Sequence, residues 1–212
     1  RPDRLAAGDF DADGYVDVAV ATLGATRIDL LRGARSGQFA ASESLDASGA
    51  VTAVMAADVG RRSGRSDLIL AVDAADGPRI DVRASSAAWP AVSNSYPIAA
   101  PATSLDAADL GRAPELSIVA ASGRSLVVLD RSGPARVDLS IAAAGLAVHR
   151  DRRGAPSIAV SDGVGSSVDV AVTRDGLVPG PAKAGAGGAL VPLGLSGVVE
   201  TGLAEGAAHW RA

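Results

Sequence analysis

The sequence contains no cysteine, a single lysine (Lys183), two histidines and only 3% aromatic residues. Without cysteine the chain has no disulfide framework, no zinc–thiolate site and no cysteine nucleophile. No apolar run reaches the roughly 18 residues that a membrane-spanning helix needs, so we expect no membrane insertion. The net charge of −4 argues against a nucleic-acid-binding protein, which needs a basic stripe.

What the chain does have is aliphatic residues and glycine. Of the 212 residues, 48% are hydrophobic, which is enough to bury a core made of Val, Leu, Ile and Ala. The chain begins with Arg1 instead of Met and shows no signal peptide. We therefore expect it to be a processed or excised piece of a longer protein.

A repeat organises the whole sequence. Short apolar runs return at intervals of 50, 50 and 40 residues, in the form DVAVATLG (17–24), DLILAVDAADG (67–77), SIVAASG (117–123) and SIAVSDG (157–163), with a fainter copy TGLAEG (201–206). Each run is preceded and followed by another run of the same kind, and Gly, Asp, Ser and Pro separate the runs. A period of 40–50 residues with about four strands is typical of a β-propeller blade.

The repeats predict an all-β fold, a β-propeller built of four-stranded blades of about 45 residues. About four and a half blades are present in one partial propeller, residues 1–212, and we expect them to be part of a larger ring. The Ala-rich stretch LSIAAAGLAV (139–148) is interpreted as strand, turn, strand because a Gly interrupts it. The expected blades cover residues 1–50, 51–102, 103–145, 146–188 and, incomplete, 189–212.

The stretch GDFDADGYVDVAVA (8–21) carries the clearest chemical signal. Asp9, Asp11 and Asp13 stand at positions 1, 3 and 5 of a loop, the backbone carbonyl of Tyr15 is available at position 7, and Asp17 closes the loop at position 9. Crowded carboxylates repel one another unless a cation lies among them. An all-oxygen ligand set favours calcium over zinc, and its flexible geometry favours calcium over magnesium.

Two other interpretations of this loop were weighed. An EF-hand begins with the same D-x-D-x-D-G pattern, but it needs a Glu at position 12, where this chain has Val20, and it needs flanking helices. An Asx-rich turn without a metal stays open. We expect one calcium ion with a structural role.

The same stretch resembles the FG-GAP/VCBS repeat of integrin-α-like β-propellers, whose calcium loop reads D-x-D-x-D-G-x-x-D between two blade strands. The resemblance implies a ring that usually has seven blades, with calcium in hairpin loops. It also implies a cell-surface or secreted protein involved in adhesion or in carbohydrate recognition. By motif match it assigns Asp9, Asp11, Asp13, the Tyr15 carbonyl and Asp17 as ligands.

The other copies depart from this pattern. In the second copy Asp58 and Asp67 keep the two ends of the loop, but arginines and glycines fill the middle. One hypothesis is that an arginine, Arg62 or its neighbour Arg61 or Arg65, replaces the metal by pairing with these carboxylates. A solvated arginine loop is the alternative.

The sequence thus predicts a calcium-stabilised, non-catalytic binding or adhesion module. Its partner would be a protein or a glycan, and its location extracellular, on the cell surface or in the periplasm. Two alternatives remain. The chain could be the propeller part of a secreted lyase or hydrolase whose chemistry lies elsewhere, or a scaffold that only spaces other domains.

Overall fold

The computed structural model describes residues 2–60, 64–85, 89–151, 154–185, 188–192, 198–204 and 207–211, and at 41–42 and beyond 185 it describes the backbone alone. Every regular element in these ranges is a β-strand, which confirms the predicted all-β class. Short runs of Val, Ile and Leu favour strands because branched side chains pack well on a pleated surface. Within these ranges no helix is long and apolar enough to cross a membrane.

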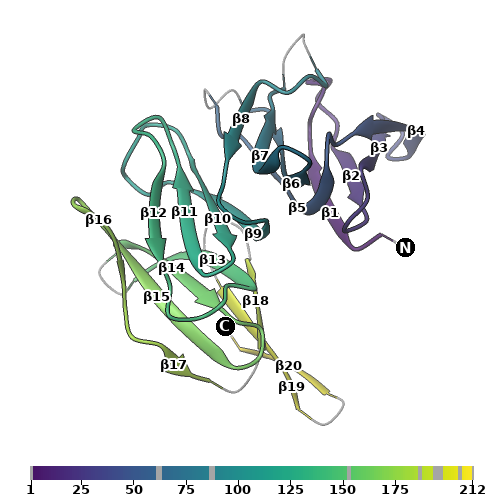
Figure 1. Ribbon diagram of the computed structural model, residues 1–212. Helices are drawn as coiled ribbons and strands as arrows, with labels where there is room; N and C mark the ends of the chain where they lie inside the picture. The colour runs from purple at the N-terminus through teal and green to yellow at the C-terminus, as the bar shows by residue number, and fades with distance from the viewer. Residues whose placement is uncertain are drawn as a thin grey trace. The chain divides into compact units, whose positions relative to one another are not determined.

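Residues 1–102 form one compact unit that holds two four-stranded antiparallel sheets. In both sheets each strand pairs with the next one along the chain, as the purple-to-teal part of Figure 1 shows. The first sheet consists of β1 (Arg4–Gly8), β2 (Asp17–Ala21), β3 (Arg27–Gly33) and β4 (Phe39–Asp46). The second consists of β5 (Ala50–Ala57), β6 (Asp67–Ala74), β7 (Gly77–Arg83) and β8 (Asn94–Pro97).

Residues 103–212 form the second unit, which repeats the same meander. Its first sheet consists of β9 (Ala102–Ala108), β10 (Ser117–Ser122), β11 (Ser125–Leu129) and β12 (Ala135–Asp138). The next consists of β13 (Gly145–Arg150), β14 (Pro156–Ser161), β15 (Ser166–Thr173) and β16 (Gly176–Pro179), with β17 (Lys183–Ala184) paired to β15. The last holds three strands, β18 (Gly188–Pro192), β19 (Val198–Ala204) and β20 (Ala207–Arg211).

Each unit has its own hydrophobic core. In the first unit, β1 packs against β5 and β6, and the core includes Ala19, Leu30, Leu68 and Leu70, none of which is exposed to solvent. Phe10, from the β1–β2 loop, is buried in the same core. The loop that carries the acidic residues is therefore anchored by an aromatic ring at its second position.

In the second unit, side chains of β9 bind the backbone of β13. Ser104 Oγ accepts a hydrogen bond from the Leu146 N–H at 3.4 Å, and Asp106 Oδ2 accepts one from the Val148 N–H at 2.8 Å. These amides lie on the strand at the end of its sheet, where backbone donors lack a neighbouring strand. The two side chains therefore accept hydrogen bonds from edge-strand amides that no neighbouring strand binds.

The stretch 139–148 is a strand only in its second half, β13, and residues 139–144 are irregular. The interpretation of its first half as a strand was wrong. The Leu139 N–H donates to the Arg124 carbonyl at 2.8 Å and the Ala143 N–H to the Gly123 carbonyl at 2.7 Å. The segment therefore binds the turn between β10 and β11 instead of entering a sheet.

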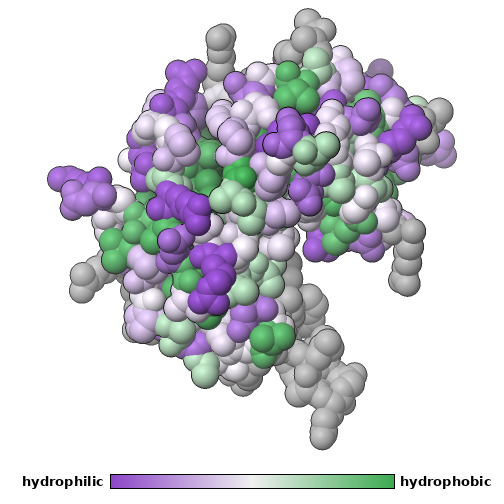
Figure 2. Space-filling model, in the orientation of Figure 1, coloured by the Kyte–Doolittle hydropathy of each residue, from purple (hydrophilic) through white to green (hydrophobic). Residues whose placement is uncertain are grey.

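The surface mixes polar and apolar residues. On the face that Figure 2 shows, hydrophobic groups stand apart from one another among hydrophilic ones. Exposed large apolar side chains occur in both units, for example Leu5, Val16, Phe39 and Val164. Scattered residues of this kind are normal on a protein surface. Charge clusters and cavities are therefore better guides to function here.

Candidate metal centre

Asp17, the first residue of β2, ties the acidic loop to the third strand. Its side chain is fully buried, its Oδ2 accepts a hydrogen bond from the Phe10 N–H at 3.1 Å, and its Oδ1 accepts one from the Gly33 N–H at 2.9 Å. Gly33 is the last residue of β3. One carboxylate thus connects the start of the loop, the start of β2 and the end of β3.

The loop folds around its own carboxylates. Asp9 accepts hydrogen bonds from the Asp13 and Gly14 N–H groups, each at 3.1 Å. Asp13 accepts one from the Tyr15 N–H at 2.8 Å. Ala12 and Gly14 have φ values of 67° and 88°, in the left-handed region that a tight turn requires and that glycine adopts most easily. The backbone conformation of this turn therefore explains why Gly14 occupies position 6 of the motif.

The fold brings three of the predicted ligands together. Asp9, Asp11 and Asp17 each offer a carboxylate oxygen, and these oxygens lie within 4.8 Å of one another. Oxygens bound to one calcium at 2.3–2.6 Å can be at most roughly 5 Å apart, so the spacing and the donor type both fit this ion. Asp13 is outside this group, and its Oδ1 binds the Tyr15 amide. Calcium and the Tyr15 carbonyl ligand stay predictions.

Arg32, near the end of β3, is the residue that sequence reasoning missed. Its Nη1 lies 2.8 Å from Asp11 Oδ2 and 3.8 Å from Asp17 Oδ2, and its Nη2 lies 3.0 Å from Glu43 Oε2. The Arg32 side chain is 21% exposed, so it balances the acidic group from a partly buried position. Only the register of β2 and β3 could have predicted this contact, because pairing Val18 with Leu31 places Arg32 beside the loop.

Burial and hydrogen bonding oppose each other at Asp17. Burial raises the pKa of this carboxyl above its usual value, and the nearby Asp11 raises it further. The Gly33 and Phe10 amides and the Arg32 guanidinium act in the opposite direction on that pKa. Burial is the largest effect, so the pKa is raised on balance and a positive charge at this position stabilises the ionised form.

Aromatic rings cover the loop. The ring of Phe10 stacks on that of Trp89, with centroids 5.6 Å apart and planes 5° from parallel. The Arg32 guanidinium carbon lies 5.9 Å from the centre of the Trp89 ring. Because Trp89 belongs to the β7–β8 connection, the second sheet contributes to the surroundings of the first sheet's acidic loop.

The second loop keeps the buried aspartate without the acidic cluster. Asp67, the first residue of β6, accepts hydrogen bonds from the amides of Val59, Gly60 and Ser85 at 3.0–3.2 Å. Burial raises its pKa, and the carboxylate of Asp58 raises it further. Arg62 lies outside the described residues, so its pairing with Asp58 and Asp67 stays a prediction.

In the third sheet, the position that corresponds to Arg32 carries an acidic residue instead of a basic one. Pairing Ile118 with Leu129 places Asp130 where the first sheet has Arg32. Asp130 is bound by Arg112 of the β9–β10 loop, whose Nε lies 3.0 Å from Asp130 Oδ2. A second pair joins Glu115 of the same loop to Arg131, with Oε1 and Nε 3.1 Å apart. The loop therefore contributes one cation and one anion to ion pairs with the two residues that follow β11.

Comparison with known proteins shows the fold. No family model and no curated protein matches the sequence. A crystal structure of BBS1N in complex with ARL6DN, soaked with lead, is similar with a TM-score of 0.66 and 13% sequence identity over 98% of this chain. A second crystal structure of the two proteins, soaked with mercury, gives a TM-score of 0.49 and 10% identity, covering 94% of this chain and 73% of that chain.

This chain spans 64% of the BBS1N chain in the first of these structures. Together with the antiparallel four-stranded sheets, the similarity shows that the chain has the β-propeller fold that its repeats predicted.

Proposed function

We propose that the chain is a calcium-stabilised, non-catalytic binding module, the partial propeller of an exported protein. The observation that carries the proposal is the convergence of Asp9, Asp11 and the buried Asp17 on one point of the β1–β2 loop. Their oxygens would hold the ion, and the FG-GAP/VCBS resemblance adds Asp13 and the Tyr15 carbonyl.

The calcium would have a structural role. Asp17 already connects the loop to the end of β3 through the Gly33 amide. When bound, the ion supplies the positive charge that a buried carboxylate and its two acidic neighbours need. The residues of the chain do the remaining work, because they fix the loop, the start of β2 and the end of β3 relative to one another.

The binding role rests on the fold. Propellers place variable loops on one face, and such loops are where rigid scaffolds carry binding residues. BBS1N, which has a similar fold, was crystallised in complex with another protein, ARL6DN. We propose that this chain likewise binds a partner through its loops, either a protein or a glycan, and carries out no chemistry on it.

An extracellular, cell-surface or periplasmic location accords with the calcium proposal. Extracellular calcium modules have dissociation constants of about 10⁻⁴–10⁻³ M, so they are loaded only where calcium is abundant. Arg32 competes for Asp11, and this competition favours an affinity in that weaker range.

The calcium proposal is tested by thermal unfolding of the 212-residue chain with calcium and with a chelator. At a calcium concentration of 100 times the dissociation constant, binding stabilises the fold by about 2.7 kcal/mol. Asp11→Asn should lose most of this increment, whereas Asp29→Asn, on β3 outside the loop, should keep it. An equal melting temperature of the wild type in calcium and in chelator would contradict the proposal.

The binding role is tested with panels of purified glycans and extracellular proteins. Saturable binding without turnover of the bound glycan supports a binding module. Turnover of a glycan by this chain would contradict the non-catalytic role. Absence of any saturable ligand across both panels would instead favour a spacer.

A further inference from the structure

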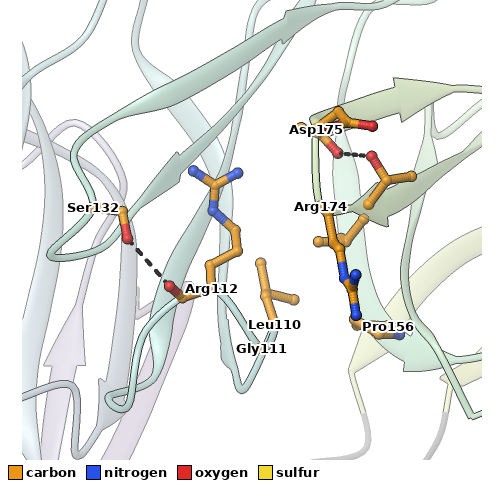
Figure 3. A pocket seen from close by; sticks show the side chains of 10 residues that line it. Leu110, Gly111, Arg112, Ser132, Pro156, Arg174 and Asp175 are labelled. Carbon is orange, nitrogen blue, oxygen red and sulfur yellow. Dashed lines mark hydrogen bonds between the residues drawn. The ribbon is translucent and has the colours of Figure 1, made fainter.

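A groove in the second unit has the features of a ligand site. It encloses about 490 Å³ between the loops of the third sheet and the β15–β16 hairpin of the fourth. Figure 3 shows Arg112 and Ser132 on one wall and Pro156, Arg174 and Asp175 on the opposite wall. Protein pockets that bind small ligands typically measure about 300–1,000 Å³, so the groove is large enough for one.

Arg112 is held in place by a closed set of hydrogen bonds. Its Nε donates to Asp130 Oδ2 at 3.0 Å, and Asp130 Oδ1 accepts the Ser132 N–H at 2.8 Å. Ser132 Oγ donates back to the Arg112 carbonyl at 3.2 Å, the left-hand dashed line in Figure 3. Because the Asp130 side chain is 1% exposed, this support is shielded from solvent.

The two Nη groups of Arg112 are left for a ligand. Among the residues that the structure describes, Asp130 accepts a hydrogen bond from the Nε, and neither Nη group donates one. The Arg112 side chain is 20% exposed, so these donors are partly desolvated but accessible. A fixed guanidinium presents its donors as a planar fork, which matches the two oxygens of a carboxylate.

The opposite wall adds a second positive charge. Arg174 lies in the turn between β15 and β16, and among the described residues it has no hydrogen-bond or ion-pair partner. The hairpin is fixed at this point by the hydrogen bond from Thr173 Oγ1 to the Gly176 carbonyl at 2.9 Å. A ligand that reaches across the groove thus meets a cation on each wall.

The remaining lining indicates which anion fits. Leu110, Pro156 and Val172 give the groove apolar surface, so a ligand needs an aliphatic body as well as a charge. Asp130 offsets Arg112, and Asp175 lies beside Arg174 on the rim. Because the buried Asp130 carboxylate already offsets Arg112, the groove suits a single negative charge better than a doubly charged phosphate.

We propose that this groove binds a carboxylate carried on an aliphatic chain, as an acidic side chain of a protein partner presents it. The proposal rests on the binding function proposed above and identifies a specific contact for it. Arg112 and Arg174 would bind the carboxylate, and Leu110 and Val172 would contact the aliphatic part.

The test is a titration of the isotopically labelled 212-residue chain, followed by amide NMR signals of Gly111, Ser132 and Gly176. The probes are acetyl-Val-Glu-Leu-amide, its Gln counterpart and inorganic phosphate. We expect saturable shifts with the Glu peptide and at least tenfold weaker binding of the Gln peptide. Equal binding of the two peptides, or tighter binding of phosphate than of the Glu peptide, overturns the assignment.

Variants locate the contact. Arg174→Gln should weaken the Glu peptide at least threefold without unfolding the chain, because Arg174 supports nothing else in the described structure. Arg112→Lys should weaken it at least fivefold, since lysine keeps the charge but not the planar fork. Arg136→Gln, an exposed arginine on β12, is the matched control and should bind as the wild type does. Wild-type affinity in both test variants overturns the proposal.

The outcome also separates this proposal from the binding function itself. If a purified protein partner binds Arg174→Gln and Arg112→Lys as tightly as it binds the wild type, the binding function stands and the groove assignment is wrong. If neither the peptides nor any purified glycan or protein binds the wild type, both are wrong.

Discussion

The first two sheets begin their second strand with a buried aspartate, whereas the third begins it with the buried Ser117 and the fourth has the buried Ser157 as the second residue of β14. Asp17 and Asp67 each bind amides of the preceding loop and an amide at or beyond the end of the third strand. Ser117 Oγ is buried with no hydrogen-bond partner in the described structure, and Ser157 Oγ donates to the Val170 carbonyl at 3.3 Å. The aspartates therefore organise their loops, and the serines do not.

This difference shows how one repeat supports two kinds of loop. A carboxylate offers two acceptor oxygens and can connect a loop to a neighbouring strand, but burial makes its charge costly. The first sheet offsets that cost with Arg32 and, as we propose, with calcium. A serine has no charge to offset, and the third loop instead builds its ion pair between Arg112 and the buried Asp130.

The largest expected effect comes from removing the aspartate. Asp17→Ala leaves the Phe10 and Gly33 amides without their acceptor, and unsatisfied buried donors cost about 1–3 kcal/mol each, so we expect a loss of about 3 kcal/mol. Ser117→Ala, the matched change in the third sheet, should change stability by less than about 0.5 kcal/mol. Urea unfolding in chelator measures both, and equal losses would break the comparison.

The next effect concerns how closely the first loop packs on its third strand. A Cβ at Gly33 would collide with the Val16 carbonyl oxygen and lie 2.8 Å from its carbon, so Gly33→Ala should cost about 2 kcal/mol. Gly60 of the β5–β6 loop serves as a control glycine, because a Cβ there would lie 3.5 Å from Asp67 Oδ2, an ordinary contact. Gly60→Ala should therefore be nearly neutral in the same unfolding assay, and a similar cost at both sites would show that the loss in Gly33→Ala does not come from the contact with Val16.

A smaller effect is expected from the cation. Arg32→Gln removes the ion pair with Asp11, so in chelator the chain should lose about 1 kcal/mol. Calcium should then bind severalfold more tightly, because the guanidinium no longer competes for the carboxylate. Terbium luminescence titrations measure this affinity, with Arg27→Gln at the other end of β3 as the control. Unchanged affinity in Arg32→Gln would show that the guanidinium and the metal do not compete.

The smallest effect is a pH dependence in the second unit. Burial raises the pKa of Asp106 above the ordinary 3.8, so the folded chain holds this proton more tightly than the unfolded chain does. Stability from this group is greatest below pH 3.8 and decreases as the pH rises through the raised pKa. Relative to Asp106→Asn, the wild type should lose unfolding free energy over that interval, and a constant difference from pH 3 to pH 7 would contradict this.

The sequence predicts the local features and misses the distant ones. The apolar runs beginning at 17, 67, 117 and 157 correspond to β2, β6, β10 and β14, because alternation and turn residues are local signals. The convergence of Asp9, Asp11 and Asp17 follows from their spacing in one loop. Arg32 and Trp89 reach that loop only through strand register and sheet packing, which depend on pairing between distant residues.

The Arg32–Asp11 and Arg112–Asp130 ion pairs, which have opposite polarity, also distinguish the first repeat from the third. Arg32 on the third strand binds Asp11 of its own loop, whereas in the third sheet Asp130 directly follows the third strand and the loop carries Arg112. If the third loop met the first sheet during folding, Arg112 would lie beside Arg32, and the reverse exchange would place Asp11 beside Asp130. Like charges disfavour both mispairings at this position, so they act against an exchange of the two segments as the chain folds.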